Sequence, residues 1–459
     1  MKLHFRSKDG SLLCIALRCY QEQLMDVSAS IILNEGNCRK QFEGMLPLHH
    51  SNWRSKIDKD TVVVYDQVGE GDEAKQLKME GISVIGAGPF HDYLELDRLG
   101  CMEWLDQHKI RTPETHIFND FDKAKEFISK TPYPLIFKPS GELPPDTTYV
   151  ASAPGNEDLL FHLDKLEKMS KGAEFILQRK VEGIEISSEV WYYQGKPLLP
   201  HNHTFEEKKS LNEGLGPSTG CAGNVVTIHR GPCFIYDHVF RPIEEDLRAE
   251  QYTGVLDWNS IYNVEEGRLY VIEATSRFGY DAIQCLCGLF LLPLSEVFWK
   301  WGKGELEELP LLDSPSIGVR VTIPLEKGKK EAPAEEYIGG VEGADGYWFS
   351  DVKQLEGRIV TAGWDGNILT ATSSSFDIEV AKAQVYSKLD KLILGAKSYR
   401  TDIGKRFKED WDSILRANSH YIKATAEYIQ AEKQEDHKRK KLEDDYPPIE
   451  FGGVPVETT

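Results

Sequence analysis

Two apolar segments of the chain each end in a carboxylate. The first is Gly254-Val-Leu-Asp257, the second is Leu269-Tyr-Val-Ile-Glu273, and a polar stretch at 259–268 separates them. Apolar runs on both sides of such a turn-rich stretch predict a β-hairpin. Because neighbouring strands lie about 4.8 Å apart, Asp257 and Glu273 are placed to bind one divalent cation, and Mg²⁺ takes such oxygen ligands together with substrate phosphates. Two hairpin carboxylates exposed to solvent are the alternative.

Polar residues also follow two other apolar runs. Lys138 ends Leu135-Ile-Phe-Lys138, where a lysine can be a point charge for phosphate or a surface side chain. The strand predicted at 174–178 continues through Arg179 to Glu185. Backbone groups at such a strand end can bind an adenine edge and Glu185 can accept ribose hydroxyls, since ligand pockets combine apolar linings with a few polar groups. A plain hairpin with exposed acids is the alternative.

A glycine-rich loop and two histidines are weaker signals. The loop at 212–223 follows Lys208, and its glycines allow backbone amides to approach an anion closely. His201 and His203 lie on one face of a predicted strand and could be two metal ligands. No third ligand is near in sequence, so histidines that are exposed or satisfied by hydrogen bonds are favoured. The chain has no GxSxG motif, P-loop or Rossmann GxGxxG.

Alternating strands and helices must position these residues. In the first ninety residues the patterns predict helices over 11–23 and 72–80 and strands over 28–33, 61–65 and 82–85. This alternation favours a parallel α/β sheet. Further along, the patterns predict helices over 93–108 and 158–169 and strands over 134–138, 175–178 and 183–193. Residues 317–407 are rich in predicted strands and end in a helix over 377–394, which indicates a separate small α+β domain.

The C-terminal segment differs from the rest. A helix is predicted over 410–432, where Ile414, Tyr421 and Tyr428 recur every seven residues. So short a heptad stripe favours docking on the same chain over a dimer helix. The charge run at 433–441 and the Pro- and Gly-containing end at 447–459 favour a solvated, disordered tail.

Composition limits the class of protein. The chain has 459 residues, enough for about three domains, and a net charge of −20 argues against general nucleic-acid coating, which needs a basic surface. Its eight scattered cysteines predict reduced thiols. Residues 1–10 have no apolar signal-peptide core, and the apolar stretch at 285–294 is too short to cross a bilayer. We expect a soluble, cytoplasmic protein without membrane partners; the oligomeric state stays open.

The order of these segments resembles the ATP-grasp ligases, and within them the phosphoribosylamine–glycine ligases (GAR synthetases), from about Asp60 to Phe407. Leu94-Glu-Leu-Asp-Arg98 corresponds to the family's L-E-G-S-K, and Leu215-Gly-Pro-Ser-Thr-Gly220 to its T-G-P-N-T-G. Residues 273–279 resemble its E-F-N-C-R-F-G. Tyr399-Arg-Thr-Asp-Ile-Gly404 matches Y-R-x-D-I-G, which is the most family-specific segment.

The resemblance implies an α/β and α+β architecture in several parts. Residues 1–90 would form an N-terminal α/β (pre-ATP-grasp) domain, and 91–312 the ATP-grasp domain, with a lid at about 115–185. Residues 313–408 would form a C-terminal α+β domain, and 409–459 a helix followed by a disordered tail.

The resemblance also implies an activity. ATP, with Mg²⁺ or Mn²⁺, would phosphorylate a carboxylate such as glycine or another amino acid, and an amine would attack the acyl phosphate. The implied ATP-binding residues are Arg98, Lys138, Gln178, Arg179, Val181 and Glu185. The implied substrate-binding residues are Lys208, Ser218, Thr219 and Gly220. The implied metal ligands are Asp257, Glu273 and Thr275, and Arg277 would be catalytic.

Several departures fall on substrate-facing positions. The family's phosphate-covering loop, G-L-A-A-G-K-G, is here Gly141-Glu-Leu-Pro-Pro-Asp-Thr-Thr148, and Thr275 replaces a metal-site asparagine. The first candidate is the ligase of purine biosynthesis. The second, which the altered loop slightly favours, is a paralogue that joins an amino acid to a different amine or to a modified nucleotide or base. A non-catalytic ATP-grasp binding or scaffold protein is the third.

Overall fold

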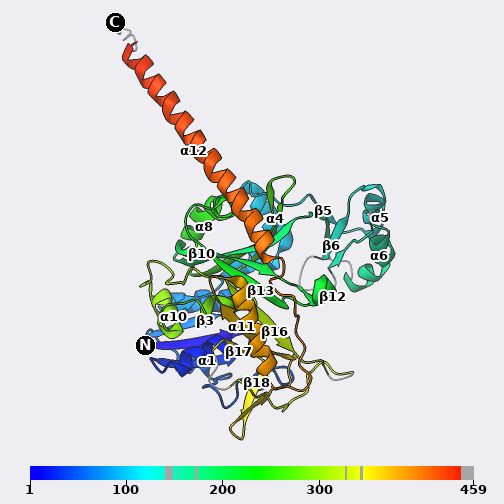
Figure 1. Ribbon diagram of the computed structural model, residues 1–459, viewed down its shortest axis with the longest axis vertical. Coiled ribbons are helices and arrows are strands. Elements are labelled where there is room, and N and C mark those ends of the chain that lie inside the picture. The colour runs from blue at the N-terminus through cyan, green and yellow to red at the C-terminus, as the bar shows by residue number, and fades with distance from the viewer. Residues whose placement is uncertain (140–147, 154, 171–173, 326–327, 342–344, 446–459) are drawn as a thin grey trace, which may run out of the picture.

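The computed structural model describes residues 1–139, 148–153, 155–170, 174–325, 328–341 and 345–445 (Figure 1). Its N-terminal unit is a parallel sheet in the order β2-β1-β3-β4, as the α/β alternation predicts. The strands are β1 (Lys2–Ser7), β2 (Asp26–Ile31), β3 (Thr61–Tyr65) and β4 (Ser83–Ile85), and the helices are α1 (Leu13–Gln21) and α2 (Gly71–Met79).

The strand β1 has no counterpart in the sequence prediction. Its His4 and Arg6 give it a polar pattern, yet both side chains are buried. His4 bonds Ser28 and Ser30 on the neighbouring strand, and Arg6 pairs with Glu73 at 3.1 Å. Buried polar groups are tolerated when they are hydrogen-bonded, so hydrophobic periodicity alone misses this strand.

One long helix is predicted over 93–108, but the structure has two. The helices are α3 (Pro89–Leu96) and α4 (Arg98–Gln107), and Asp97 between them has non-helical backbone angles. The Asp97 side chain accepts a hydrogen bond from the Gly100 amide at 3.0 Å, so it caps the N-terminus of α4. The break places Arg98 at the first position of α4.

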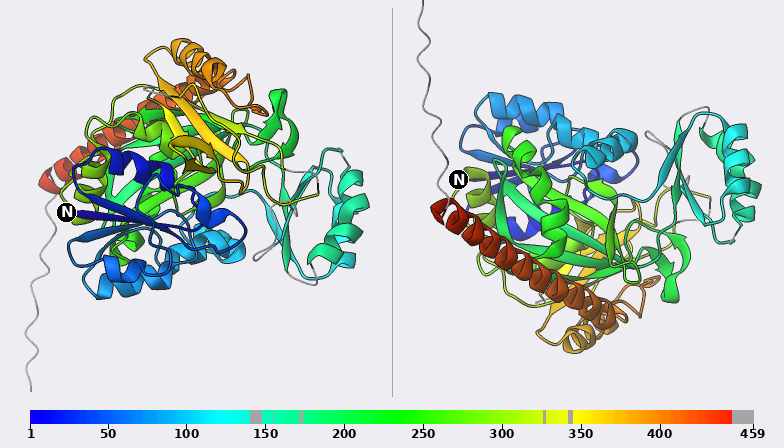
Figure 2. Two further views of the ribbon diagram at one scale, coloured as in Figure 1. Left: turned by 90° about the horizontal axis from the view of Figure 1, so that it is seen from below. Right: turned by 90° about the horizontal axis from the view of Figure 1, so that it is seen from above.

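A second sheet forms a lid unit, residues 115–179, which protrudes from the body (Figures 1 and 2). Its order is β5-β8-β6-β7, and Phe121, Phe137 and Phe175 pack in a core of its own. Its elements are β5 (Thr115–Phe118), α5 (Phe121–Lys130), β6 (Leu135–Pro139), β7 (Tyr149–Val150), α6 (Glu157–Ser170) and β8 (Phe175–Arg179). The predicted strands at 134–138 and 175–178 and the helix at 158–169 are confirmed. Of the loop at 141–148, all but Thr148 lies outside the described residues.

The central sheet joins strands from most of the remaining chain. Its described strands run in the order β15-β14-β9-β10-β13-β16-β20-β17. They are β9 (Ile184–Tyr193), β10 (Lys196–Glu206), β13 (Gly223–His229), β14 (Gly254–Asn263), β15 (Arg268–Thr275), β16 (Ser316–Thr322), β17 (Tyr347–Phe349) and β20 (Asn367–Ser374). The hairpin predicted around 259–268 is β14–β15. Of the described strands after residue 313, β16, β17 and β20 extend this sheet, so the sheet crosses the predicted boundary of the C-terminal domain. The remaining domain boundaries stay predictions.

Shorter elements surround the central sheet. Two hairpins project from it, β11 (Lys209–Leu211) with β12 (Leu215–Ser218), and β18 (Val352–Leu355) with β19 (Arg358–Thr361). The other helices of this part are α7 (Phe234–Val239), α8 (Glu244–Ala249), α9 (Ala282–Cys287), α10 (Leu294–Lys303) and α11 (Ile378–Lys391). The helix α11 packs on β16 and β20, in the place of the helix predicted over 377–394.

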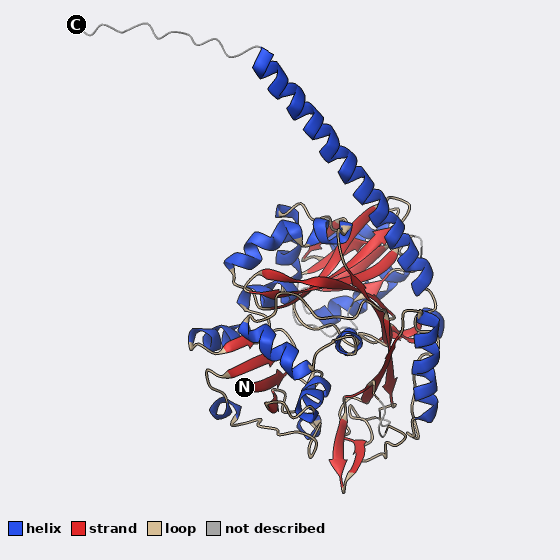
Figure 3. Ribbon diagram, turned by 60° about the vertical axis from the view of Figure 1, so that its left-hand side comes forward, coloured by secondary structure: helices blue, strands red, loops and turns tan. Residues whose placement is uncertain are grey.

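The last helix, α12 (Phe407–Asp445), begins on the body and then leaves it (Figures 1 and 3). Its Ile414 is buried, and the Tyr421 hydroxyl donates to Asp237 at 2.9 Å, so the predicted docking on the same chain is confirmed. The prediction of a disordered tail from residue 433 is wrong as far as Asp445, because the Lys, Glu, Gln and Arg of the charge run favour helix. The tail from 447 lies outside the described residues. None of the described helices is long and apolar enough to cross a membrane.

Candidate active site

One face of the central sheet carries a row of acidic and polar side chains. Asp257 in β14 lies opposite Glu189 of β9 and Thr275 of β15, and Asn259 lies opposite Ser187 and Glu273. Residues directly opposite in antiparallel strands share a face. The register therefore brings together Asp257, Glu273 and Thr275, which sequence reasoning selected as metal ligands.

Cations surround Glu273. The Arg98 guanidinium lies 3.3 Å from its carboxylate. Burial alone would raise the pKa of Glu273, but Arg98, Lys138, Lys208 and Arg277 outweigh it and lower that pKa. Four cationic side chains from four different parts of the chain thus face one ionised carboxylate. Such a concentration of positive charge can hold a polyanion, such as a chain of phosphates.

Lys138 reaches this site from the lid unit. It is buried, and its Nζ donates to Gln178 Oε1 at 2.9 Å. The Gln178 amide in turn donates to the Thr115 hydroxyl at 3.0 Å, which fixes its orientation. Burial and the nearby Arg98 lower the pKa of Lys138 to about 8. Lys138 is therefore a buried cation without a carboxylate in hydrogen-bond contact among the described residues, which suits it to an anionic ligand.

Asp257 is more deeply buried than Glu273. Both of its carboxylate oxygens accept from the Ser187 hydroxyl, and Glu189 lies beside it. Burial and the charge of Glu189 raise the pKa of Asp257 well above its usual range. The buried Asp257 and the Glu273 carboxylate thus lie on one face in different surroundings, Asp257 beside another carboxyl and Glu273 among cations.

Glu189 makes the stability of the fold depend on pH. Burial raises its pKa from 4.5 to about 7, although Trp191 Nε1 donates to its Oε1 at 2.8 Å. A carboxyl with a raised folded-state pKa loses its contribution to stability as pH rises through that pKa. Relative to the wild type, Glu189→Gln should therefore gain about 2 kcal/mol in free energy of unfolding between pH 5 and pH 8. Denaturant unfolding at both pH values measures this, and parallel pH dependences would contradict it.

Asn259 is a site residue that sequence reasoning missed. It lies opposite Glu273, and its Nδ2 donates to Thr275 Oγ1 at 3.2 Å. No described residue donates a hydrogen bond to its Oδ1. Thr275 stands where the family has an asparagine and therefore lacks an amide oxygen. Asn259 on the adjacent strand has an amide oxygen on the same face of the sheet. The sequence places Asn259 at the start of a polar stretch and does not show that it lies beside Glu273, because that contact depends on the register between β14 and β15.

Arg277 is held by a residue from the N-terminal part of the chain. Its Nε donates to Glu95 of α3 at 2.7 Å, and Glu95 also accepts from the Ser276 amide at 2.8 Å. The guanidinium lies 4.9 Å from the centre of the Tyr280 ring. Arg277 is thus fixed in one direction, with a planar fork of donors that suits a carboxylate or phosphate.

Lys208 bridges the acids at the other end of the row. Its ammonium pairs with Glu185 and, at 3.6 Å, with Glu206. Burial would lower the pKa of Lys208, but these two carboxylates outweigh it and raise that pKa. Glu185 is therefore paired with the Lys208 ammonium.

The family-specific segment 399–404 positions this lysine. Arg400 is buried and pairs with Asp402 at 2.8 Å and with Glu207 at 3.0 Å. Its Nη1 donates to the Lys209 carbonyl at 3.0 Å. Glu207 and Lys209 flank Lys208, so the C-terminal segment fixes the backbone on both sides of it.

The remaining predicted residues lie at the edges of this face. The Thr219 amide donates to the Lys208 carbonyl at 2.7 Å, Gly220 lies beside Tyr280, and Ser218 is exposed in β12. The Arg179 guanidinium pairs with Glu266 at 3.6 Å. Val181 is buried, and none of the described residues accepts a hydrogen bond from its N–H.

Comparison with known proteins gives consistent matches. Residues 101–282 match the family described as phosphoribosylglycinamide synthetase, ATP-grasp (A) domain. The phosphoribosylamine–glycine ligase of Halalkalibacterium halodurans is 24% identical over 344 residues, which cover 71% of this chain and 77% of the relative. That of Helicobacter pylori is 25% identical over 342 residues, which cover 72% and 78%.

Solved structures agree in fold. The phosphoribosylamine–glycine ligase of Thermotoga maritima superposes with a TM-score of 0.69 at 18% identity, covering 88% of this chain and all of that one. The biotin carboxylase domain of 2-oxoglutarate carboxylase from Hydrogenobacter thermophilus, in complex with MgADP, ADP and bicarbonate, gives 0.61 at 16% identity and covers 86% and 91%.

Proposed function

We propose that this chain, an ATP-grasp protein similar to the phosphoribosylamine–glycine ligases, is an ATP- and Mg²⁺-dependent carboxylate–amine ligase. The observation that carries the proposal is the placement of four cations around Glu273, on the face of the sheet that also bears Asp257. Polyphosphate and a divalent cation need this combination of positive side chains and carboxylates at one point.

The described residues of the site fall into two groups, those that would bind the nucleotide and those that would bind the substrates. Lys138 and Arg98 would hold the phosphates, and Glu185 the ribose. The adenine would meet the strand end at Gln178, Arg179 and Val181, where the Val181 N–H has no partner among the described residues. Lys208 and the loop with Ser218, Thr219 and Gly220 would close the site from the side of β11 and β12.

The residues on the hairpin fit a hard cation. Glu273 is ionised, and Asn259 Oδ1 and Thr275 Oγ1 lie on the same face. Oxygen ligands of this kind suit Mg²⁺, and Asp257 lies opposite Thr275 on the same face. When bound there, the cation would offset the charge of the β- and γ-phosphates.

We expect Asn259→Ala to raise the Mg²⁺ concentration that gives half-maximal activity by about tenfold, in the range of ligand-supporting residues. The Asn259→Asp variant keeps an oxygen at the same place and should not show this rise. Titration of the activity with Mg²⁺ at saturating ATP measures both. An unchanged Mg²⁺ requirement in the alanine variant would remove Asn259 from the site.

The chemistry proceeds in two steps. A carboxylate oxygen of the substrate attacks the γ-phosphorus, the bond to the β-phosphate oxygen breaks, and ADP leaves. The amine then attacks the acyl carbon, its nitrogen loses a proton to the departing phosphate or to solvent, and phosphate leaves with the former carboxylate oxygen. Arg277, held by Glu95 and Tyr280, would orient the carboxylate and then the acyl phosphate; Glu95 is a positioning residue.

Glycine and phosphoribosylamine are the first candidate substrates, since the relatives' names imply them. A different amine, or a modified nucleotide or base, is the second, because Thr275 and the residues after Gly279 depart from the family's pattern at substrate-facing positions.

ADP release in the presence of candidate amino acids and amines tests the activity. Growth of a strain that lacks the purine-pathway ligase, rescued by this chain, would identify the first candidate. ADP release with another amine, without rescue, would identify the second. Nucleotide binding without ADP formation across a broad substrate panel would instead indicate a non-catalytic binding or scaffold protein.

A further inference from the structure

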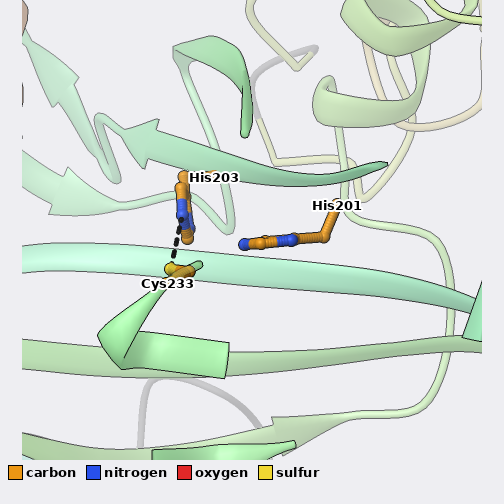
Figure 4. A group of neighbouring side chains, drawn as sticks. All are labelled: His201, His203 and Cys233. Carbon is orange, nitrogen blue, oxygen red and sulfur yellow. Dashed lines mark hydrogen bonds between the residues drawn. The ribbon is translucent and has the colours of Figure 1, made fainter. Parts of the chain in front are cut away.

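The opposite face of the central sheet carries a separate cluster of side chains. His201 and His203 lie in β10, His229 lies opposite His201 at the end of β13, and Cys233 precedes α7. The ligand atoms of His201, His203 and Cys233 all lie within 4.8 Å of one another, and all three residues are buried. Figure 4 shows the two imidazoles and the thiol converging. Sequence reasoning missed Cys233 because it is thirty residues from His203 and is brought close only by the fold.

The hydrogen bonds of the cluster leave ligand atoms directed inward. His203 Nδ1 bonds the Ser188 hydroxyl at 2.7 Å, so its Nε2 faces Cys233 Sγ, 3.7 Å away. His201 Nε2 is buried and has no hydrogen-bond partner. A buried, unpaired polar atom destabilises a fold. The sequence pattern favours histidines that are exposed or hydrogen-bonded, but His201 Nε2 is neither. An ion between these atoms would supply the missing partner.

The spacing matches a tetrahedral centre. Zinc–sulfur bonds of about 2.3 Å and zinc–nitrogen bonds of about 2.0–2.1 Å in tetrahedral geometry place sulfur and nitrogen about 3.6 Å apart. The Cys233–His203 separation is 3.7 Å. The bond from Ser188 to His203 Nδ1 also corresponds to the outer hydrogen bond that fixes the ring of a metal-binding histidine.

We propose that His201, His203 and Cys233 bind one Zn²⁺ ion, with the fourth position directed to the adjacent cavity. That cavity has a volume of about 420 Å³, and His201, His229, Pro232 and Cys233 are among its lining residues. It gives an ion a path to the buried ligands. The His229 ring lies 5.2 Å from that of His201 and its Nε2 bonds the Pro232 carbonyl at 3.2 Å, so His229 would exchange that bond for the metal if it supplied the fourth ligand. On binding, the Cys233 thiol proton is released to solvent and the thiolate bonds the metal.

The ion would join three parts of the fold. The His203 ring lies 5.7 Å from the Trp411 ring of α12. Asn418 of α12 accepts from the Phe234 amide at 2.9 Å and donates to the Pro232 carbonyl at 3.0 Å. Zinc at this point would therefore fix the central sheet, α7 and the base of α12 together, which is a structural role independent of the proposed ligase activity.

Cobalt(II) titration of the full-length, metal-stripped chain tests the site. We expect one equivalent to bind with a thiolate-to-cobalt charge-transfer band and the visible absorption of a tetrahedral ion, and Zn²⁺ to displace it. Cys233→Ser should lose the band, and His203→Gln should bind at least tenfold more weakly. Cys19→Ser, the same change at another buried cysteine, and Glu273→Ala, on the opposite face of the sheet, should both keep it.

Thermal unfolding gives a second measurement. Zn²⁺ should raise the Tm of the wild type and of Cys19→Ser but leave that of Cys233→Ser unchanged. The fourth ligand is either His229 or a water molecule from the cavity, and His229→Gln distinguishes them. Weakened metal binding in this variant identifies His229, and unchanged binding identifies water. A wild-type cobalt spectrum without a thiolate band would overturn the proposal even if Cys233→Ser failed to fold. Equal metal binding by Cys233→Ser and Cys19→Ser would overturn it as well.

Discussion

Replacing Glu273 with alanine is expected to lower the rate of ADP formation by about 10²- to 10³-fold, the range for removing one group that acts on developing charge. The substitution removes a cation ligand. It also leaves Arg98, Lys138, Lys208 and Arg277 facing one another without the carboxylate they share. ADP release at saturating ATP and Mg²⁺ measures the effect.

Glu265→Ala is the matched control for this variant, because Glu265 lies exposed in the turn of the same hairpin. It should keep wild-type turnover. Robust turnover by Glu273→Ala would contradict the assignment of Glu273 to the cation site.

Replacing Lys138 with alanine is expected to lower kcat/KM for ATP by about 10²-fold, since it removes a buried cation from the phosphate site. The pH dependence is the more specific expectation. Burial and Arg98 lower the pKa of Lys138 to about 8. The ammonium is therefore charged below this pH and loses its proton above it, so kcat/KM for ATP, which reports groups of the free enzyme, should fall as pH rises through 8.

The Lys138→Arg variant tests the cause of that fall, because a guanidinium stays charged throughout this range. It should flatten the alkaline limb of the profile, even if its absolute rate is lower. Lys123→Ala, at an exposed position of the same lid unit, should leave both rate and profile unchanged. An identical alkaline limb in wild type and Lys138→Arg would assign the ionisation to another group.

Local patterns predicted many of the elements. The strand at 61–65 and the hairpin with Asp257 and Glu273 follow from apolar runs bounded by turn residues. The site residues that sequence reasoning chose on this hairpin lie on one face because strand alternation has a period of two. The break at Asp97 was missed because an N-cap in the middle of an amphipathic pattern resembles any other polar position.

Pairings between distant strands could not be read from the sequence. Asn259 and Glu189 join the site only through the register of β14 with β9 and β15. The C-terminal strands continue the central sheet through contacts between β13 and β16, which lie far apart in the chain. The segment that contains Arg400 resembles a family signature in sequence. The ion pair of Arg400 with Glu207 and its hydrogen bond to the Lys209 carbonyl depend on the tertiary fold.

The fate of a carboxylate oxygen tests the proposed ligase most directly. Amino acids labelled with oxygen-18 in the carboxylate are incubated with the chain, ATP, Mg²⁺ and candidate amines, and the released phosphate is analysed by mass spectrometry. Transfer through an acyl phosphate predicts ADP, an amide and phosphate that carries one labelled oxygen. ATP turnover that depends on the amine but releases unlabelled phosphate would contradict carboxylate activation.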